Sequence, residues 1–300
     1  MKIKLNLCHA AFILLTASLL IGSGCSKKES SSSATSTADN STSPFTVSEI
    51  TQTNSGDGYF TGSFVVPSDG ISFLLSTHKD NNASVAFYSL SDPDGTDILS
   101  SSSTPTLNGV ASGSLGANRY ANVLVPQSPS FSAEAGTWSF VANNNDRVKL
   151  ALRSGSTPTS TTIVVQPYIT GTTWAAGDLT ATLSVMSGIY STNGITLTIN
   201  STITISDSQY AAISGTFTDS TTSALVSQGV TEGVNLFFIK DYSDSEHLGN
   251  AAGIPGSMGI ANSWNGVLIS LSAHASGATL DSQLLGETAA HEMGHQLGLF

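Results

Sequence analysis

The fourteen residues Glu287-Thr-Ala-Ala-His-Glu-Met-Gly-His-Gln-Leu-Gly-Leu-Phe300 carry the strongest structural signal in the sequence. Asp281, shortly before them, is a favourable N-cap for a helix that runs through most of this stretch. His291 and His295 are four residues apart, so a helix places both imidazole rings on the same face. The sequence therefore predicts a helix with a paired histidine face.

Two imidazoles at this spacing can bind one zinc ion. Glu292 follows His291 and is rotated about 100° round the helix, which keeps its carboxyl beside the metal and not on it. There Glu292 can act as the general base on a zinc-bound water. The alternative is a helix with two histidines and no metal. Apolar neighbours such as Met293 argue against it, because a buried helix with unpaired polar side chains carries uncompensated desolvation.

The pattern resembles the metzincin clan of zinc endopeptidases, whose motif is His-Glu-x-x-His-x-x-Gly-x-x-His followed by a methionine-containing turn. His291, Glu292, His295 and Gly298 match the first four fixed positions. The resemblance implies protein or peptide substrates, a third zinc ligand at position 301 and a methionine turn further on. Since Phe300 is the last residue, we expect the sequence to be a fragment and not a defective copy.

The resemblance covers roughly residues 161–300, where strands and helices are mixed. Apolar residues at Leu179, Leu183, Met186 and Tyr190 mark one face of a helix. The expected strands are Thr161–Pro167, Ile195–Ile205, Val234–Ile239 and Val267–Leu271, and the expected helices before the last are Asp178–Tyr190 and Thr221–Gln228. This order predicts a mixed sheet with helices over residues 158–300, the N-terminal part of an α+β metzincin-like catalytic domain whose C-terminal subdomain is missing.

The resemblance also offers an interpretation of Gly253–Ile260. By analogy, this glycine-rich segment is the edge strand that pairs with an extended peptide substrate. A plain surface loop is the alternative.

Residues 45–157 contain short alternating runs separated by turn residues, without helical periodicity. The runs are Tyr59–Val66, Ile71–Leu75, Val85–Leu90, Ala121–Val125, Thr137–Ala142 and Val148–Leu152. They predict an all-β sandwich that loosely resembles the accessory domains of secreted bacterial peptidases. Polar residues in its loops could bind Ca²⁺, although Asp and Asn are also common turn formers, which is the interpretation we favour. These residues are Asp80, Asn81, Asn82, Asp92, Asp94 and Asp97.

The N-terminus reads as a targeting segment. Residues 1–24 combine a basic start, an apolar stretch and a small-residue end, which is typical of a signal peptide. Cys25 resembles the lipidated cysteine of bacterial lipoproteins; ordinary cleavage after Gly24 is the alternative. Residues 25–44 are rich in Ser and Thr and predict a flexible tether. We therefore expect an exported protein, held by a lipid anchor on Cys25 in the cell envelope (the bacterial outer membrane or surface), or secreted.

Composition restricts the remaining classes. Only 10% of the residues are charged and the net charge is −11, which argues against nucleic-acid binding. Two cysteines exclude a disulfide-rich scaffold. The remaining candidates are a zinc endopeptidase and a non-catalytic surface lipoprotein or adhesin with a degenerate peptidase domain; the intact Glu292 favours the enzyme.

The other histidines and the tryptophans do not form a recognisable metal-binding or catalytic motif. His78, His247 and His274 have no ligand spacing, so we expect them on the surface. Trp138, Trp174 and Trp264 are expected to serve in packing.

Overall fold

The computed structural model describes residues 45–79, 84–99, 106–107, 112–114, 116–118, 120–126, 132–143, 148–156, 161–171, 174–244, 246–260 and 262–299. The predicted signal peptide, Cys25 and the tether lie outside these residues. So do Asp80, Asn81 and Asn82, and residues 157–160 at the junction between the two predicted domains. In the described ranges, no helix is long and apolar enough to cross a membrane.

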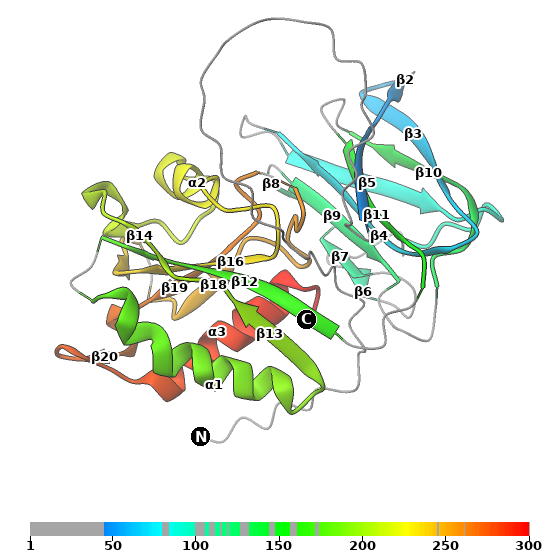
Figure 1. Ribbon diagram of the computed structural model, residues 1–300. Helices are drawn as coiled ribbons and strands as arrows, with labels where there is room; N and C mark the ends of the chain where they lie inside the picture. Colours follow the sequence, from blue (N-terminus) through cyan, green and yellow to red (C-terminus); the bar gives the residue numbers. More distant parts are fainter. Residues whose placement is uncertain are drawn as a thin grey trace, which may run out of the picture.

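The first half of the chain forms two antiparallel sheets (Figure 1). The first has the order β1-β11-β4-β9-β7-β6 and the second has the order β2-β3-β10-β5-β8. The strands of the first are β1 (Phe45–Ile50), β4 (Gly70–His78), β6 (Thr106–Leu107), β7 (Ser112–Ser114), β9 (Tyr120–Val125) and β11 (Val148–Ser154). Those of the second are β2 (Gln52–Gly56), β3 (Tyr59–Val66), β5 (Ser84–Ser91), β8 (Gly116–Asn118) and β10 (Gly136–Ala142). All six strands predicted here are confirmed.

One hydrophobic core joins these two sheets. Phe64 and Val66 of β3 are buried in it, whereas Val65 between them is 64% exposed. The ring of Phe73 from β4 in the other sheet lies 5.0 Å from those of Phe64 and Trp138. Alternation along each strand therefore sends one set of side chains into the core, as its period of two requires. We call residues 45–154 the β-rich unit.

The second half contains a mixed sheet of order β13-β12-β16-β19-β18, with β14 also paired to β12. The strands are β12 (Thr161–Thr170), β13 (Ile195–Ile199), β14 (Ile203–Ile205), β16 (Val234–Ile239), β18 (Gly249–Ala251) and β19 (Val267–Ser270). Only β18, at the edge, is antiparallel to its neighbour. The helices are η1 (Ala176–Leu179), α1 (Thr180–Ser191), η2 (Ser208–Tyr210), α2 (Ser220–Val226), η3 (Ser272–His274) and α3 (Ser282–Gln296). Short strand pairs are β15 (Ala212–Ile213) with β17 (Asp241–Tyr242), and β20 (Ala275–Ser276) with β21 (Thr279–Leu280).

Both faces of the central strands β16 and β19 are covered, which explains why these strands are almost continuously apolar. In β16, Val234, Leu236 and Phe238 join the core shared with α1 and α3, while Phe237 and Ile239 join the core on the side of α2. Figure 1 shows α1 and α3 on one side of the sheet and α2 on the other. The α1 face predicted from Leu179, Leu183, Met186 and Tyr190 is buried as expected.

Two predictions for this half need correction. The single strand expected over Ile195–Ile205 is two strands, β13 and β14, because one extra residue shifts the pairing with β12 between Ile199 and Ile203. Gln166 donates from its side chain to Ser201 O (3.0 Å) in this gap, where the strand ladder is interrupted.

Gly253–Ile260 is not the edge strand; the prediction was wrong, and β18 takes that position. The backbone polar groups of Gly253–Ile260 form hydrogen bonds with other parts of the chain. Asn122 Nδ2 of β9 donates to Pro255 O (2.9 Å), and Gly256 N–H donates to Gln296 O in α3 (2.9 Å). The segment is therefore a loop held between the β-rich unit and the end of α3.

The contact between the two halves is polar and buried. Ser257 Oγ lies 3.3 Å from both Ser76 Oγ of β4 and Asn122 Oδ1 of β9. All three residues are at most 2% exposed. Beside them, the ring of Tyr120 lies 4.2 Å from that of Trp264. Hydrogen bonding satisfies these polar groups away from water, so the contact holds one relative position.

Candidate active site

Helix α3 begins where the sequence predicts. The Asp281 carboxyl accepts hydrogen bonds from the backbone N–H groups of Gln283 (3.1 Å) and Leu284 (3.0 Å). Leu285, Ala289 and Met293, each four residues apart, are fully buried in the core beneath the sheet. The opposite stripe of the helix is left for His291 and His295.

Contacts with α1 fix α3 in place. Tyr190 of α1 donates its hydroxyl hydrogen to Ala290 O (3.0 Å), one residue before His291. The helices approach closely at Gly286, where an added Cβ would lie 2.7 Å from the Val185 side chain. Burial raises the pKa of Tyr190, so this hydroxyl remains a donor.

The two histidines meet as expected. Their Nε2 atoms are 3.0 Å apart, and both rings lie toward the solvent side of the helix. His295 Nδ1 lies 2.7 Å from Leu299 O. Because a carbonyl oxygen only accepts, Nδ1 carries the hydrogen and Nε2 of the neutral ring keeps its lone pair. His295 is therefore in the tautomer that a metal ligand needs.

The end of the helix supplies that carbonyl. Gly298 has φ +98°, Leu299 N–H donates to Gly294 O (3.0 Å) and Gly298 N–H donates to His295 O (2.8 Å). These are the two bonds of a Schellman turn, which reverses the chain at a glycine. The turn brings Leu299 O back over the ring of His295.

Glu292 lies between α3 and the edge strand. Ala251 N–H of β18 donates to its carboxyl, and an added Cβ on Gly249 would lie 2.6 Å from its Cγ. Burial raises the pKa of Glu292, while the nearby His295 and His291 oppose the shift. The short Gly249 thus leaves room for a half-buried carboxyl beside the histidine pair.

The two histidine nitrogens have a spacing that suits zinc, but they form only part of a zinc site. Two imidazole nitrogens on a tetrahedral zinc ion are about 3.3 Å apart, close to the 3.0 Å between His291 and His295. In the described part of the chain, no group of three or more His, Cys, Asp or Glu side chains converges on one point. These residues therefore bring two imidazole nitrogens together beside a carboxyl.

Residues 177–300 match the family described as "Metallo-peptidase family M12B Reprolysin-like". The match supports a metallopeptidase domain over this range, which contains α1, the mixed sheet from β13 on, and α3. The comparison with curated proteins finds no match.

Two of the three described candidates for Ca²⁺ binding, Asp92 and Asp97, hydrogen-bond to nearby backbone groups. Asp92 Oδ1 accepts from Thr96 N–H (2.8 Å), and Asp97 Oδ1 accepts from the N–H groups of Leu90 (3.1 Å) and Leu99 (3.0 Å). These bonds hold turns between strands. The structure therefore gives no support to a calcium site at these aspartates.

His274 is not on the surface, and that prediction was wrong. It is 2% exposed, with Nδ1 2.6 Å from Ser270 O and Nε2 2.8 Å from Thr288 Oγ1 of α3. The 3₁₀ turn at Ser272–His274 folds the ring under α3, which no local sequence pattern indicated. His247 is exposed as expected, and its ring lies 6.1 Å from that of Tyr242. Trp138 and Trp264 are buried packing residues.

Sequence reasoning also missed the edge strand beside Glu292. Gly249–Ala251 is short and contains no β-branched residue, so strand propensity gave no signal. Its position next to the buried apolar strand β19 could only emerge from the fold.

Proposed function

We propose that residues 158–300 form part of a zinc-dependent endopeptidase of the metzincin type, acting on peptide bonds in protein substrates. The observation that carries the proposal is the pair of facing Nε2 atoms of His291 and His295, with His295 held in the ligand tautomer by Leu299 O. The match to a reprolysin-like metallopeptidase family supports the same reading. The alternative, a non-catalytic adhesin, has no observation in its favour.

In this proposal His291 and His295 hold the zinc ion together with a third ligand. Zinc, when bound, would polarise the scissile carbonyl and make water more acidic. Glu292 would take the proton of the attacking water and pass it to the leaving amine. Its partial burial and raised pKa suit a group that both accepts and returns a proton. Ala251 N–H would keep its carboxyl oriented during both steps.

The experiment measures zinc content by mass spectrometry and cleavage of a quenched fluorescent peptide library by the full-length protein. Glu292→Gln should retain zinc and lose about 10²–10⁴-fold in kcat. Glu287→Gln is the matched control, since Glu287 is exposed one turn earlier and accepts only from Gln283 Nε2 (2.6 Å). Cleavage that survives both a chelator and Glu292→Gln would refute the proposal.

We further propose that residues 45–157 form a separate β-sandwich domain, and that the protein is exported and anchored through a lipid on Cys25, or secreted. The apolar stretch and small residues before Cys25 support export. Metabolic labelling with a palmitate analogue tests the anchor: the natural protein should take up label and Cys25→Ser should not. Equal labelling of both would refute it.

A further inference from the structure

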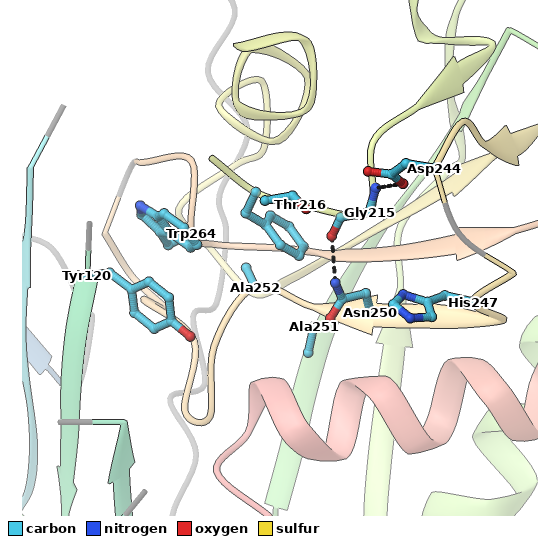
Figure 2. Close-up of a pocket in the computed structure, with 10 residues that line it drawn as sticks. Tyr120, Gly215, Thr216, Asp244, His247, Asn250, Ala251, Ala252 and Trp264 are labelled. Carbon is cyan, nitrogen blue, oxygen red and sulfur yellow. Dashed lines mark hydrogen bonds between the residues drawn. The ribbon is translucent and has the colours of Figure 1, made fainter. Parts of the chain in front are cut away.

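A cavity of about 480 Å³ lies between the β-rich unit and the edge strand β18, on the face of the strand away from α3 (Figure 2). Tyr120 comes from β9 of the β-rich unit, and the other walls come from the metallopeptidase half. The size falls within the usual range of ligand pockets. It shares β18 with the candidate active site.

The cavity has an aromatic end and an acidic end (Figure 2). At the first, the Trp264 ring lies 4.2 Å from that of Tyr120 and 5.9 Å from that of Phe217. At the second, Asp244 is exposed, and its carboxyl accepts hydrogen bonds from Ser214 Oγ and from Gly215 N–H (2.8 Å). Of the described residues that line the cavity, none is Lys or Arg.

The carboxylate of Asp244 is fixed and charged. The hydroxyl of Ser214 and the N–H of Gly215 lower its pKa, so it is ionised at neutral pH. Asn250 Nδ2 donates to Gly215 O (2.7 Å), which ties the same loop to the edge strand. The negative wall is therefore in place before any ligand arrives.

The edge strand separates this cavity from Glu292. Gly249 and Ala251 meet Glu292 on the side of α3, whereas the Asn250 side chain between them points away from α3 (Figure 2). Asn250 lines the cavity together with Ala251 and Ala252. An extended peptide lying along an edge strand sends successive side chains to opposite faces of the sheet. A peptide bound along β18 would thus place alternate side chains on the side of this cavity.

We propose that the cavity takes a basic side chain, preferentially arginine, from a peptide substrate lying along β18. The carboxylate of Asp244 at the acidic end would bind the guanidinium, while the rings of Tyr120 and Trp264 at the aromatic end would pack against the aliphatic stem. This inference rests on the proposed peptidase function and names its substrate class. It also gives the β-rich unit a part in substrate recognition, because Tyr120 belongs to it.

The test separates recognition from cleavage. Fluorescent eight-residue peptides, each with arginine at one position and matched peptides with glutamine there, are titrated into the full-length Glu292→Gln variant. At the position that reaches the cavity, arginine should bind about tenfold tighter than glutamine. Adding Asp244→Asn should reduce this preference to about twofold or less.

Asp207→Asn is the matched control. Asp207 is also exposed and also accepts one backbone and one side-chain hydrogen bond, from Gln209 N–H (3.0 Å) and Gln209 Nε2 (2.6 Å). It lies outside the cavity, so the arginine preference should stay intact. Tyr120→Leu should weaken binding of the arginine peptide several-fold. Thermal unfolding of each variant checks that the fold persists.

An arginine preference that is absent, or that survives Asp244→Asn, would overturn the inference. Cleavage by the natural protein distinguishes the two proposals. Selective arginine binding without any cleavage would leave the cavity assigned and refute the peptidase. Cleavage without arginine selectivity would support the peptidase and refute the arginine site.

Discussion

Two histidine sites involve helix α3, and they differ in the hydrogen-bond partners of their ring nitrogens. At the first, His274 is buried, and Ser270 O and Thr288 Oγ1 engage both nitrogens. Nδ1–H donates to the carbonyl, so Nε2 accepts from the Thr288 hydroxyl. At the second, His295 has only Nδ1 engaged by a carbonyl, and its Nε2 faces His291.

The difference separates a structural histidine from a candidate ligand. A ring whose two nitrogens are both bonded inside the protein has nothing left to offer a metal. A ring with one nitrogen fixed and the other facing a second imidazole is prepared for one. Substitutions at the two sites should therefore separate effects on metal binding from effects on stability.

His295→Ala should abolish the second site. Removing one of two described nitrogen ligands should weaken zinc binding by more than the 10–100-fold that loss of an outer-shell partner costs. Competition with a chromogenic chelator measures the affinity. Zinc binding equal to that of the natural protein would place the metal elsewhere.

His274→Ala should damage the fold and spare the metal. It leaves a cavity and two unsatisfied buried groups, Ser270 O and Thr288 Oγ1, and should lower the free energy of unfolding by about 2–4 kcal/mol. Urea denaturation measures the loss. Zinc affinity should stay within about twofold of the natural value; a large fall would mean that the two sites are not independent.

Gly298→Ala should have a weak effect on both stability and zinc affinity. Alanine at φ +98° strains the Schellman turn and should cost about 1 kcal/mol. The shift of Leu299 O away from His295 should lower zinc affinity by up to about tenfold. Unchanged affinity in a destabilised variant would show that Leu299 O does not orient the ring.

The smallest effect is on pH dependence. Burial lowers the pKa of His274 from its ordinary value of 6.5, so the unfolded chain binds its proton more tightly than the folded one. Its contribution to stability is complete above pH 6.5 and is lost as the pH falls through the folded pKa. His274→Gln should flatten this part of the curve of stability against pH, which urea denaturation at several pH values measures.

Local patterns predicted the helices and most strands. The N-cap Asp281 and the four-residue spacing to Leu285, Ala289 and Met293 are contained in one stretch of chain, so α3 could be read directly. The strand Val234–Ile239 was likewise predicted to the residue, because a strand buried on both faces is almost entirely apolar, and Asn235 is its one polar residue.

Features that depend on distant partners were missed. The segment Gly253–Ile260 satisfies its backbone through Asn122 and Gln296, more than 35 residues away on either side. The burial of His274 depends on Thr288 across the turn to α3. The cavity draws on residues from Tyr120 to Trp264, and no single stretch of sequence contains its chemistry.

The polar contact between the two halves has a consequence for protein engineering. Expression of residues 158–300 alone would uncover Ser257 and the carbonyl of Pro255, whose partners Ser76 and Asn122 lie in the β-rich unit. The same loop rests on the last turn of α3, where an added Cβ on Gly256 would lie 1.9 Å from Gln296 Nε2. A protein truncated in this way would need a redesigned loop to hold the C-terminal end of α3 in place.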